Sequence, residues 1–216
     1  EPFSCEIGGW EFIAWLKKEN LFIIPLDPEN RWFRYHHLFQ KLLVNQLKRQ
    51  CRTEEINLLH SQSSAWFAGE GLIEEALEHA LAAVDVPAAI QLVARHGHQL
   101  MDDQQWPRLE RWLDMLPQEN VEENPEMLLL RLWSNYNRTA GFNLLAGSTQ
   151  LEKIENLISI SPPNGSVKVE QIRGHCDALR SFQHFMNADG ESALKYARSA
   201  CENIPSHHKR AHLRAH

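Results

Sequence analysis

Residues 21–39 carry the sequence LFIIPLDPENRWFRYHHLF, in which two strand-type runs flank a turn. Leu21–Ile24 and Arg31–Tyr35 are rich in β-branched and aromatic residues, and the intervening PLDPEN is dense in turn formers. Two such runs with turn residues between them are the pattern of a β-hairpin. We therefore predict a hairpin near the start of the chain.

Helical patterns lie on both sides of this hairpin. Trp10–Asn20 has apolar residues on one side and charges on the other, and from His36 to Leu47 the apolar spacing is again that of a helix. Helix, hairpin and helix in so short a stretch are typical of the end of a small winged-helix domain. We predict the end of such a domain for residues 1–52.

The apolar pattern of residues 53–216 predicts only helices. Apolar residues recur three and four apart, and the stripes are interrupted by Gly69 and Gly71, by Pro117, and by the turn Asn187–Gly190. Ala76–Ala80 can also be aligned with Ala193–Ala197, and a glycine-containing turn precedes each segment. Small residues four apart let a neighbouring helix approach closely, as repeats of the tetratricopeptide (TPR) type require. The fold class is therefore mainly α, a winged-helix-like segment followed by a TPR-like array of antiparallel helix pairs, favoured over a closed bundle.

Composition and motifs exclude several classes of protein. The formal net charge of the 216 residues is -6, which argues against a nucleic-acid-coating protein, and no apolar run approaches the roughly 18–20 residues of a membrane span. No glycine precedes a lysine, so there is no P-loop, and other common catalytic motifs are missing. The four cysteines are widely spaced, as in a protein with reduced thiols. We predict a cytoplasmic protein that is not an enzyme.

A local basic patch leaves a second function open. Residues 10–52 carry a net charge of +4, whereas residues 53–216 carry -8. Winged-helix domains often bind DNA through such a surface. A stand-alone DNA-binding protein is therefore the alternative, through the basic residues Lys17, Lys18, Arg31, Arg34, Lys41, Lys48, Arg49 and Arg52.

Two further groups of residues are candidates for binding. His208, His212 and His216 lie four apart, so on a helix they would share one face and could hold a divalent metal; a frayed or tag-like end is the other interpretation. An aromatic and polar mixture near the end of one predicted helix suits an effector or partner face, although such aromatics are commonly core residues. Its members are Arg131, Trp133, Asn135 and Tyr136.

Several segments, in this order, resemble the large ATP-dependent LuxR-family bacterial regulators of the MalT-like type. The resemblance covers roughly residues 10–135, and beyond Ser134 it fades to generic helical repeats. It is carried by Leu21–Leu26, Trp32–Phe39, Trp66–Phe67, Gly71–Leu81, Trp112–Pro117 and Leu128–Trp133.

The resemblance implies a parent protein with an upstream nucleotide-binding module, a winged-helix segment, a helical sensor and a downstream DNA-binding domain. The chain begins at Glu1 without methionine and stops at His216 in a helical pattern, so we expect it to be a piece of such a parent. The helical-repeat domain, residues 53–216, is then expected to be truncated at its C-terminus. ATP would bind to the parent's upstream module, and we expect no cofactor in this piece. Arg34, Tyr35, His36 and His37, where strand passes to helix, would then be an interdomain relay.

The predicted function follows from this architecture. The piece is expected to be non-catalytic and regulatory, coupling the upstream nucleotide-binding module to an effector on the helical repeats. Its expected partners are the upstream module and the downstream DNA-binding domain of the parent chain, with a small-molecule inducer or a regulatory protein, possible self-association, and no membrane.

Overall fold

The computed structural model describes residues 9–19, 21–139, 144–160, 166–209 and 211. Contacts divide the chain into two units, Glu1–Leu59 and His60–His216. We predicted a boundary between residues 52 and 53; the structural division falls a short way further on, inside the helix α3 (Thr53–Gly69). Each unit is described separately.

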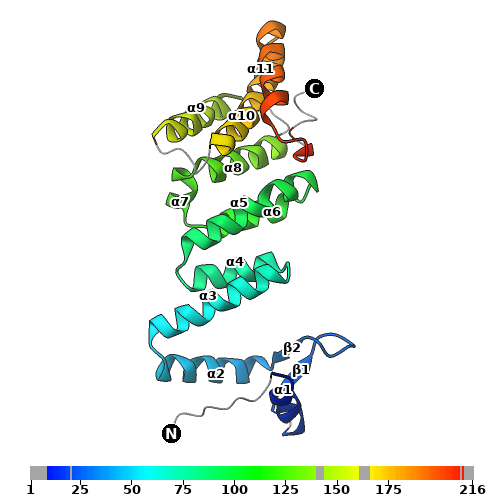
Figure 1. Ribbon diagram of the computed structural model, residues 1–216, viewed down its shortest axis with the longest axis vertical. Helices are drawn as coiled ribbons and strands as arrows, with labels where there is room; N and C mark the ends of the chain where they lie inside the picture. The colour runs from blue at the N-terminus through cyan, green and yellow to red at the C-terminus, as the bar shows by residue number, and fades with distance from the viewer. Residues whose placement is uncertain (1–8, 20, 140–143, 161–165, 210, 212–216) are drawn as a thin grey trace. The chain divides into compact units, whose positions relative to one another are not determined.

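The first unit contains the predicted helix, hairpin and helix. α1 (Gly9–Lys18) precedes strands β1 (Ile23–Pro25) and β2 (Phe33–Tyr35), and α2 (His37–Gln50) follows. The strands pair antiparallel with Ile24 opposite Arg34. Figure 1 shows the loop that joins them.

Asp27 closes the hairpin turn. Its carboxylate accepts hydrogen bonds from the backbone N–H groups of Arg31 and Trp32, each at 2.8 Å. The bond from Trp32 is the main cause of the lowered pKa of the Asp27 carboxyl group, and the Arg31 side chain lowers it further. The PLDPEN segment therefore forms a turn because an acidic side chain satisfies backbone donors that the turn leaves without partners.

The second unit is a succession of helices, as the sequence predicts. After the second part of α3 come α4 (Ile73–Ala82), α5 (Val86–Asp102), α6 (Trp106–Met115), α7 (Gln118–Glu123), α8 (Pro125–Arg138), α9 (Leu144–Ile160), α10 (Ser166–Met186) and α11 (Gly190–Asn203). The short helix α7 was not predicted, because six residues hold too few turns to produce a recognisable apolar stripe.

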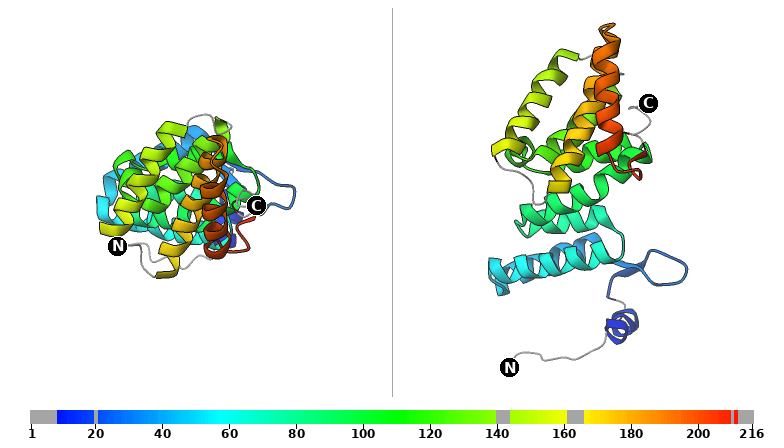
Figure 2. Two further views of the ribbon diagram at one scale, coloured as in Figure 1. Left: turned by 90° about the horizontal axis from the view of Figure 1, so that it is seen from above. Right: turned by 45° about the horizontal axis from the view of Figure 1, so that its top comes forward.

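Most consecutive helices of this unit pack against one another, and α8 also packs against α5 and α10. α4 contacts α5, α5 contacts α6 and α8, and α10 contacts α8, α9 and α11. Figures 1 and 2 show α10 and α11 running side by side in opposite directions. One continuous hydrophobic core joins these helices. Its fully buried side chains include Leu77, Trp112, Leu129 and Ile154. The predicted array of antiparallel helix pairs is confirmed.

Four helices of the unit end in the same way. After α3, α4, α5 and α10, one residue adopts positive φ: Gly71, Val84, Gln104 and Ala188. In each case its N–H and the next N–H bond back to carbonyls of the last helical turn, as for Val84 to Leu81 and Asp85 to Ala80. This is the hydrogen-bond pattern of the Schellman motif, which satisfies carbonyls that a helix end leaves open.

Caps begin the helices that follow. Asn124 Oδ1 accepts from the N–H groups of Glu126 and Met127 at the start of α8, and Asp189 caps α11 through Ser192 N. Pro87 and Pro125 occupy the first turns of α5 and α8, where a proline loses no helical hydrogen bond. Within the described residues, no helix is both long and apolar enough to span a membrane.

Candidate functional site

An open groove of about 910 Å³ lies in the helical unit. Its walls come from α5, the start of α8, α10 and the segment that follows α11. Apolar, amide and charged side chains share this lining, together with four histidines. The lining residues are Ile90, Gln91, Ala94, Arg95, His98, Gln99, Asp102, Asn124, Glu126, Leu129, Lys168, Gln171, Ile172, His175, His207 and His208.

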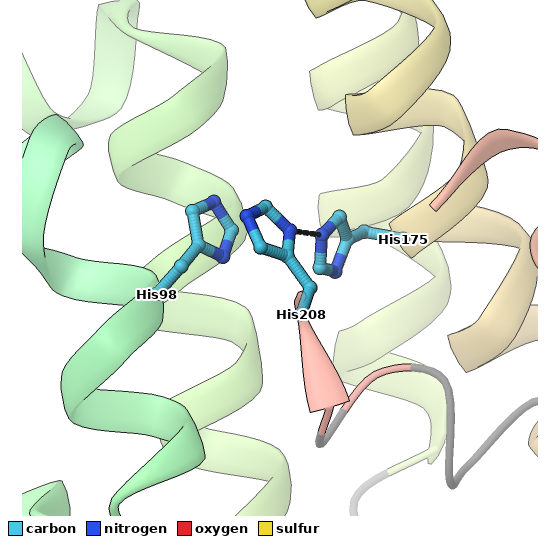
Figure 3. A group of neighbouring side chains, drawn as sticks. All are labelled: His98, His175 and His208. Carbon is cyan, nitrogen blue, oxygen red and sulfur yellow. Dashed lines mark hydrogen bonds between the residues drawn. The ribbon is translucent and has the colours of Figure 1, made fainter. Parts of the chain in front are cut away.

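Three imidazole rings meet in this groove. His98 comes from α5, His175 from α10 and His208 from the segment after α11, and Figure 3 shows the ring of His208 between the other two. One ligating nitrogen from each ring lies within 4.8 Å of those of the other two. His175 Nε2 and His208 Nδ1 are 2.9 Å apart and share a hydrogen bond.

The ring of His98 lies parallel to that of His208. Their centroids are 4.3 Å apart and their planes differ by 15°. The Nδ1 atom of His98 is buried and has no hydrogen-bond partner among the described residues. Burial is the main cause that lowers the pKa of His98 to about 3, and the neighbouring His208, His207 and Lys168 lower it further. His98 is therefore neutral at physiological pH, with a lone pair on one ring nitrogen.

Glycines bring two of these histidines into position. A Cβ atom on Gly97 would lie 2.6 Å from Leu130 Cδ1, and one on Gly174 would lie 2.9 Å from Asn203 Cβ and 3.1 Å from the Asn203 carbonyl carbon. α10 therefore approaches the end of α11 more closely at Gly174 than a side chain would allow, whereas at Gly97 the end of the Leu130 side chain from α8 lies where a Cβ atom would need space. His98 and His175 are the residues immediately after these glycines.

The charged groups of the groove are largely paired. Lys168 Nζ lies 3.5 Å from Glu126 Oε2, and the Asp102 carboxylate accepts a hydrogen bond from Lys209 N at 3.2 Å. Asp102 is four residues after His98, so it lies on the same side of α5 and also lines the groove. The groove thus offers imidazole nitrogens and a carboxylate, with the nearest lysine engaged by a glutamate.

Buried residues lie next to the histidine cluster. The rings of Trp133 and His175 meet edge to face at 6.1 Å between centroids. Cys176, the residue after His175, is fully buried, and burial raises the pKa of its thiol to about 12. This thiol is therefore a packing group and not a nucleophile.

The terminal histidine run was predicted as one helical face. In the structure His208 precedes any described helical residue of that segment, and its neighbours are His98 and His175. His212 and His216 lie outside the described residues. Neither interpretation of the run, a joint metal site with His208 or a frayed or tag-like end, is therefore tested. His98 and His175 were not selected from the sequence, because their separation along the chain carries no sign of their proximity.

The predicted effector face needs a correction at Trp133, and the binding role of the other three residues stays a prediction. Trp133 is only 2% exposed, because it lies on the inward side of α8, where its indole packs on His175 and Tyr136. Tyr136 is half-buried and meets Phe182 edge to face. Arg131 pairs with Asp114, and Asn135 accepts a hydrogen bond from Arg138. None of the four residues lines the groove.

The predicted relay residues lie where β2 passes into α2. His36 N donates to the carbonyl of Phe22 at 2.7 Å, and the ring of Tyr35 meets that of Phe39 edge to face. The rings of His36 and His37 are neighbours at 4.3 Å, and Arg34 is exposed. The strand-to-helix position is confirmed, and the relay role stays a prediction.

Comparison with known proteins gives matches along nearly all of the chain. The family model "MalT winged helix domain" matches residues 4–55. The "HTH-type transcriptional regulator MalT" of Klebsiella pneumoniae (strain 342) is 26% identical over 201 residues, covering 93% of this chain and 21% of that protein. Its namesake from Yersinia pestis (strain Pestoides F) is 28% identical over 205 residues, covering 94% of this chain and 22% of the relative.

The chain thus spans about a fifth of the length of the curated relatives it matches. No solved structure matches it. The order of elements agrees with the family model, since the helix, hairpin and helix of α1, β1, β2 and α2 fall within the matched region. The chain is therefore MalT-like, with a region that matches the MalT winged helix domain at residues 4–55 and a TPR-like helical array after it.

Proposed function

We propose that the chain is a non-catalytic regulatory part of a bacterial ATP-dependent transcription activator. It would couple an upstream nucleotide-binding module to an effector bound on the helical repeats. The observation that carries this proposal is the order of the two parts: a winged-helix region followed in the same chain by helices that form a ligand-sized groove. The relatives that align with this order are named transcriptional regulators.

The surface of α2 supports packing against another protein part. No residue of this 14-residue helix is buried. Leu38 and Leu42 are 63% and 61% exposed, and Leu43 and Val44 are exposed as well. Contiguous exposed apolar side chains mark interaction surfaces. The upstream module of the parent chain is the partner we propose for this face, with ATP bound in that module.

The groove supports effector binding. Its volume of about 910 Å³ falls within the range of small-molecule sites, and it combines apolar side chains with several polar ones. α3 crosses the division between the two units. We therefore propose that α3 links effector binding to nucleotide state by changing between two arrangements. We further propose a cytoplasmic location, a downstream DNA-binding domain in the parent, and a small-molecule inducer or regulatory protein as the effector.

A thermal-shift screen of the 216-residue chain tests the effector site. Candidate sugars, nucleotides and amino acids are added to the chain and to two variants. Ala94→Phe places a ring in the groove, and Ala82→Phe is the matched control on an exposed position of α4. We expect an effector to raise the Tm of the unchanged chain and of Ala82→Phe, but not of Ala94→Phe. Equal binding by both variants would contradict the groove as the effector site.

An ATPase assay tests the non-catalytic assignment. We expect no turnover by the chain, since its sequence contains no P-loop. Turnover that a point mutation within these residues abolishes would overturn the proposal.

DNA binding through the basic patch is the second candidate function. Its support is the exposure of Arg34, Lys41, Lys48 and Arg49 around β2 and α2. Two of the predicted cations are engaged within the unit. Lys17 Nζ lies 4.5 Å from the centre of the Phe33 ring and bonds to Asn30, and Arg31 pairs with Asp27 and Glu29.

A mobility-shift titration at several salt concentrations separates the two functions. DNA binding predicts a complex that weakens steeply with salt and on neutralising Arg34 and Lys41. Neutralising Lys153, a lysine of the helical unit paired with Glu122, is the control. The absence of any complex at low salt would dispose of this candidate.

A further inference from the structure

We propose that His98, His175 and His208 bind a divalent transition-metal cation of the zinc type in the groove of the helical unit. This inference goes beyond the regulatory role and does not depend on it. Three imidazole nitrogens from three separate segments lie within 4.8 Å of one another. Imidazole is a donor that zinc, cobalt, nickel and copper prefer.

The distances fit a cation after a small closure of the rings. Zinc–nitrogen bonds are about 2.0–2.1 Å, so the nitrogens of a tetrahedral site are about 3.3 Å apart. His175 Nε2 and His208 Nδ1 are already at 2.9 Å. No separation in the cluster exceeds 4.8 Å, so none has to shorten by more than about 1.5 Å, which rotation of the imidazole rings supplies.

The position of His98 also fits. A metal binds the lone pair of a ring nitrogen, and the ring of His98 offers a ligand atom within 4.8 Å of those of the other two histidines. The buried Nδ1 of His98 lacks a hydrogen-bond partner among the described residues, so its burial is otherwise uncompensated. Lys168 is the nearest lysine of the groove, and its ion pair with Glu126 reduces its repulsion of a cation.

The open groove leaves room for a further ligand. Three protein ligands with an open fourth position are typical of accessible zinc sites, where water or a small ligand completes the coordination. Asp102, one helical turn from His98, also lines the groove and adds negative charge to it. A cation here would join α5, α10 and the segment after α11, which are distant in sequence.

Spectroscopic titration of the full 216-residue chain tests the site. After removal of metals with a chelator, Co²⁺ is added, and its visible absorption reports both stoichiometry and geometry; Zn²⁺ is then used to displace it. We expect one Co²⁺ per chain in a nitrogen-rich site that Zn²⁺ empties. Each of His98→Gln, His175→Gln and His208→Gln should weaken the affinity at least about tenfold.

His60→Gln and His79→Gln are the matched controls. His60 Nδ1 and His79 Nδ1 are also 2.9 Å apart, but among the described residues no third ligand atom joins this pair. We expect these variants to bind Co²⁺ as the unchanged chain does. The double variant His212→Gln/His216→Gln tests the terminal run. Loss of binding in the double variant, with unchanged binding in His98→Gln and His175→Gln, would place the site at the chain end and overturn the proposal.

A measurement on the unchanged chain covers the case in which a variant fails to fold. In long-range ¹H–¹⁵N spectra, Zn²⁺ should shift the ring nitrogens of His98, His175 and His208 and leave those of His60 and His79 in place. Absence of any stoichiometric binding, or shifts confined to other histidines, would overturn the proposal.

Discussion

Ser181 donates a hydrogen bond from its Oγ atom to the backbone carbonyl of Ala193, at 2.9 Å, and thereby ties α10 to α11. Ser64 makes the same bond to Ala76 at 2.7 Å, between α3 and α4, with the same spacing of 12 residues. Both serines are buried. The helix pairs α3–α4 and α10–α11 therefore repeat one interhelical contact.

Ring contacts follow the same correspondence. Phe67 stacks on His79 at 5.2 Å in the first pair, and His184 stacks on Tyr196 at 5.3 Å in the second. Together with the buried serines, these contacts strengthen the weak sequence match between Ala76–Ala80 and Ala193–Ala197. The repeat is structural, because it preserves positions and contacts while the residue types at the ring positions change.

Removing the repeated serine contact should lower stability. We expect Ser181→Ala to reduce the free energy of unfolding by about 1 kcal/mol, since it removes one hydrogen bond in a buried setting. Denaturant unfolding followed by circular dichroism measures this change. Ser159→Ala removes a bond of similar length, to the Glu155 carbonyl, on an exposed helix surface and should cost less than about 0.5 kcal/mol. An equal loss in both variants would contradict the role of burial.

Val84 is a site where a substitution should stabilise the protein. It has a φ of 60° and is 74% exposed, so its β-branched side chain is strained in the left-handed region without contributing to the core. We expect Val84→Gly to raise the free energy of unfolding by up to about 1 kcal/mol. Ala82→Gly, in the preceding helix, should lower it by about 1 kcal/mol. A loss of stability in Val84→Gly would show that the strain is overestimated.

Gly174 should not tolerate even a methyl group. A Cβ atom would lie 3.1 Å from the backbone carbonyl carbon of Asn203 and 3.1 Å from Ile204 Cγ1, so the end of α11 has to move. We expect Gly174→Ala to destabilise the chain by about 1–2 kcal/mol despite the higher helix propensity of alanine. Gly190→Ala is the control, because nothing lies within 4 Å of its added Cβ. Thermal unfolding of both variants would decide the point.

The stability of the metal-free protein should fall in acid because of His98. Its pKa is lowered from 6.5 to about 3, so between these pH values the unfolded chain binds a proton that the folded chain does not. The free energy of unfolding is unaffected by this group above pH 6.5 and decreases below it, by about 2 kcal/mol at pH 5. His79 and His96, whose pKa values are also lowered, act in the same direction.

His98→Gln isolates the contribution of this one ring. Its unfolding free energy should depend less on pH between 5 and 6.5 than that of the unchanged chain, when both are measured in a chelator. The groups that face His98 are His175, His207, His208 and Lys168, and they stay in place in the variant. Identical pH profiles would contradict the assignment.

The cysteines should differ in reactivity. Burial raises the pKa of the Cys176 thiol to about 12, whereas Cys51 and Cys201 are half-buried. We expect brief alkylation of the native chain near pH 8 to label Cys51 and Cys201 and to spare Cys176, as measured by peptide mass spectrometry. Labelling of all three in denaturant is the control. Rapid native labelling of Cys176 would show that the core around α10 opens readily.

The sequence by itself determined the local structure. Asn187–Gly190 predicted the turn before α11, and the PLDPEN segment predicted the hairpin. These signals act over a few residues, because capping side chains, proline and turn formers satisfy or remove nearby backbone donors. The apolar periodicity also predicted which helix faces are buried.

Only the tertiary structure decided which distant residues meet. His98, His175 and His208 belong to three segments, and their proximity depends on helix approaches at Gly97 and Gly174 that no local pattern encodes. The orientation of Trp133 was equally inaccessible, since periodicity does not distinguish an aromatic in the core from one on a binding face. Local hydrogen bonding fixes an element within its own segment, whereas a site assembled across α5, α10 and the end of α11 depends on how whole helix surfaces pack.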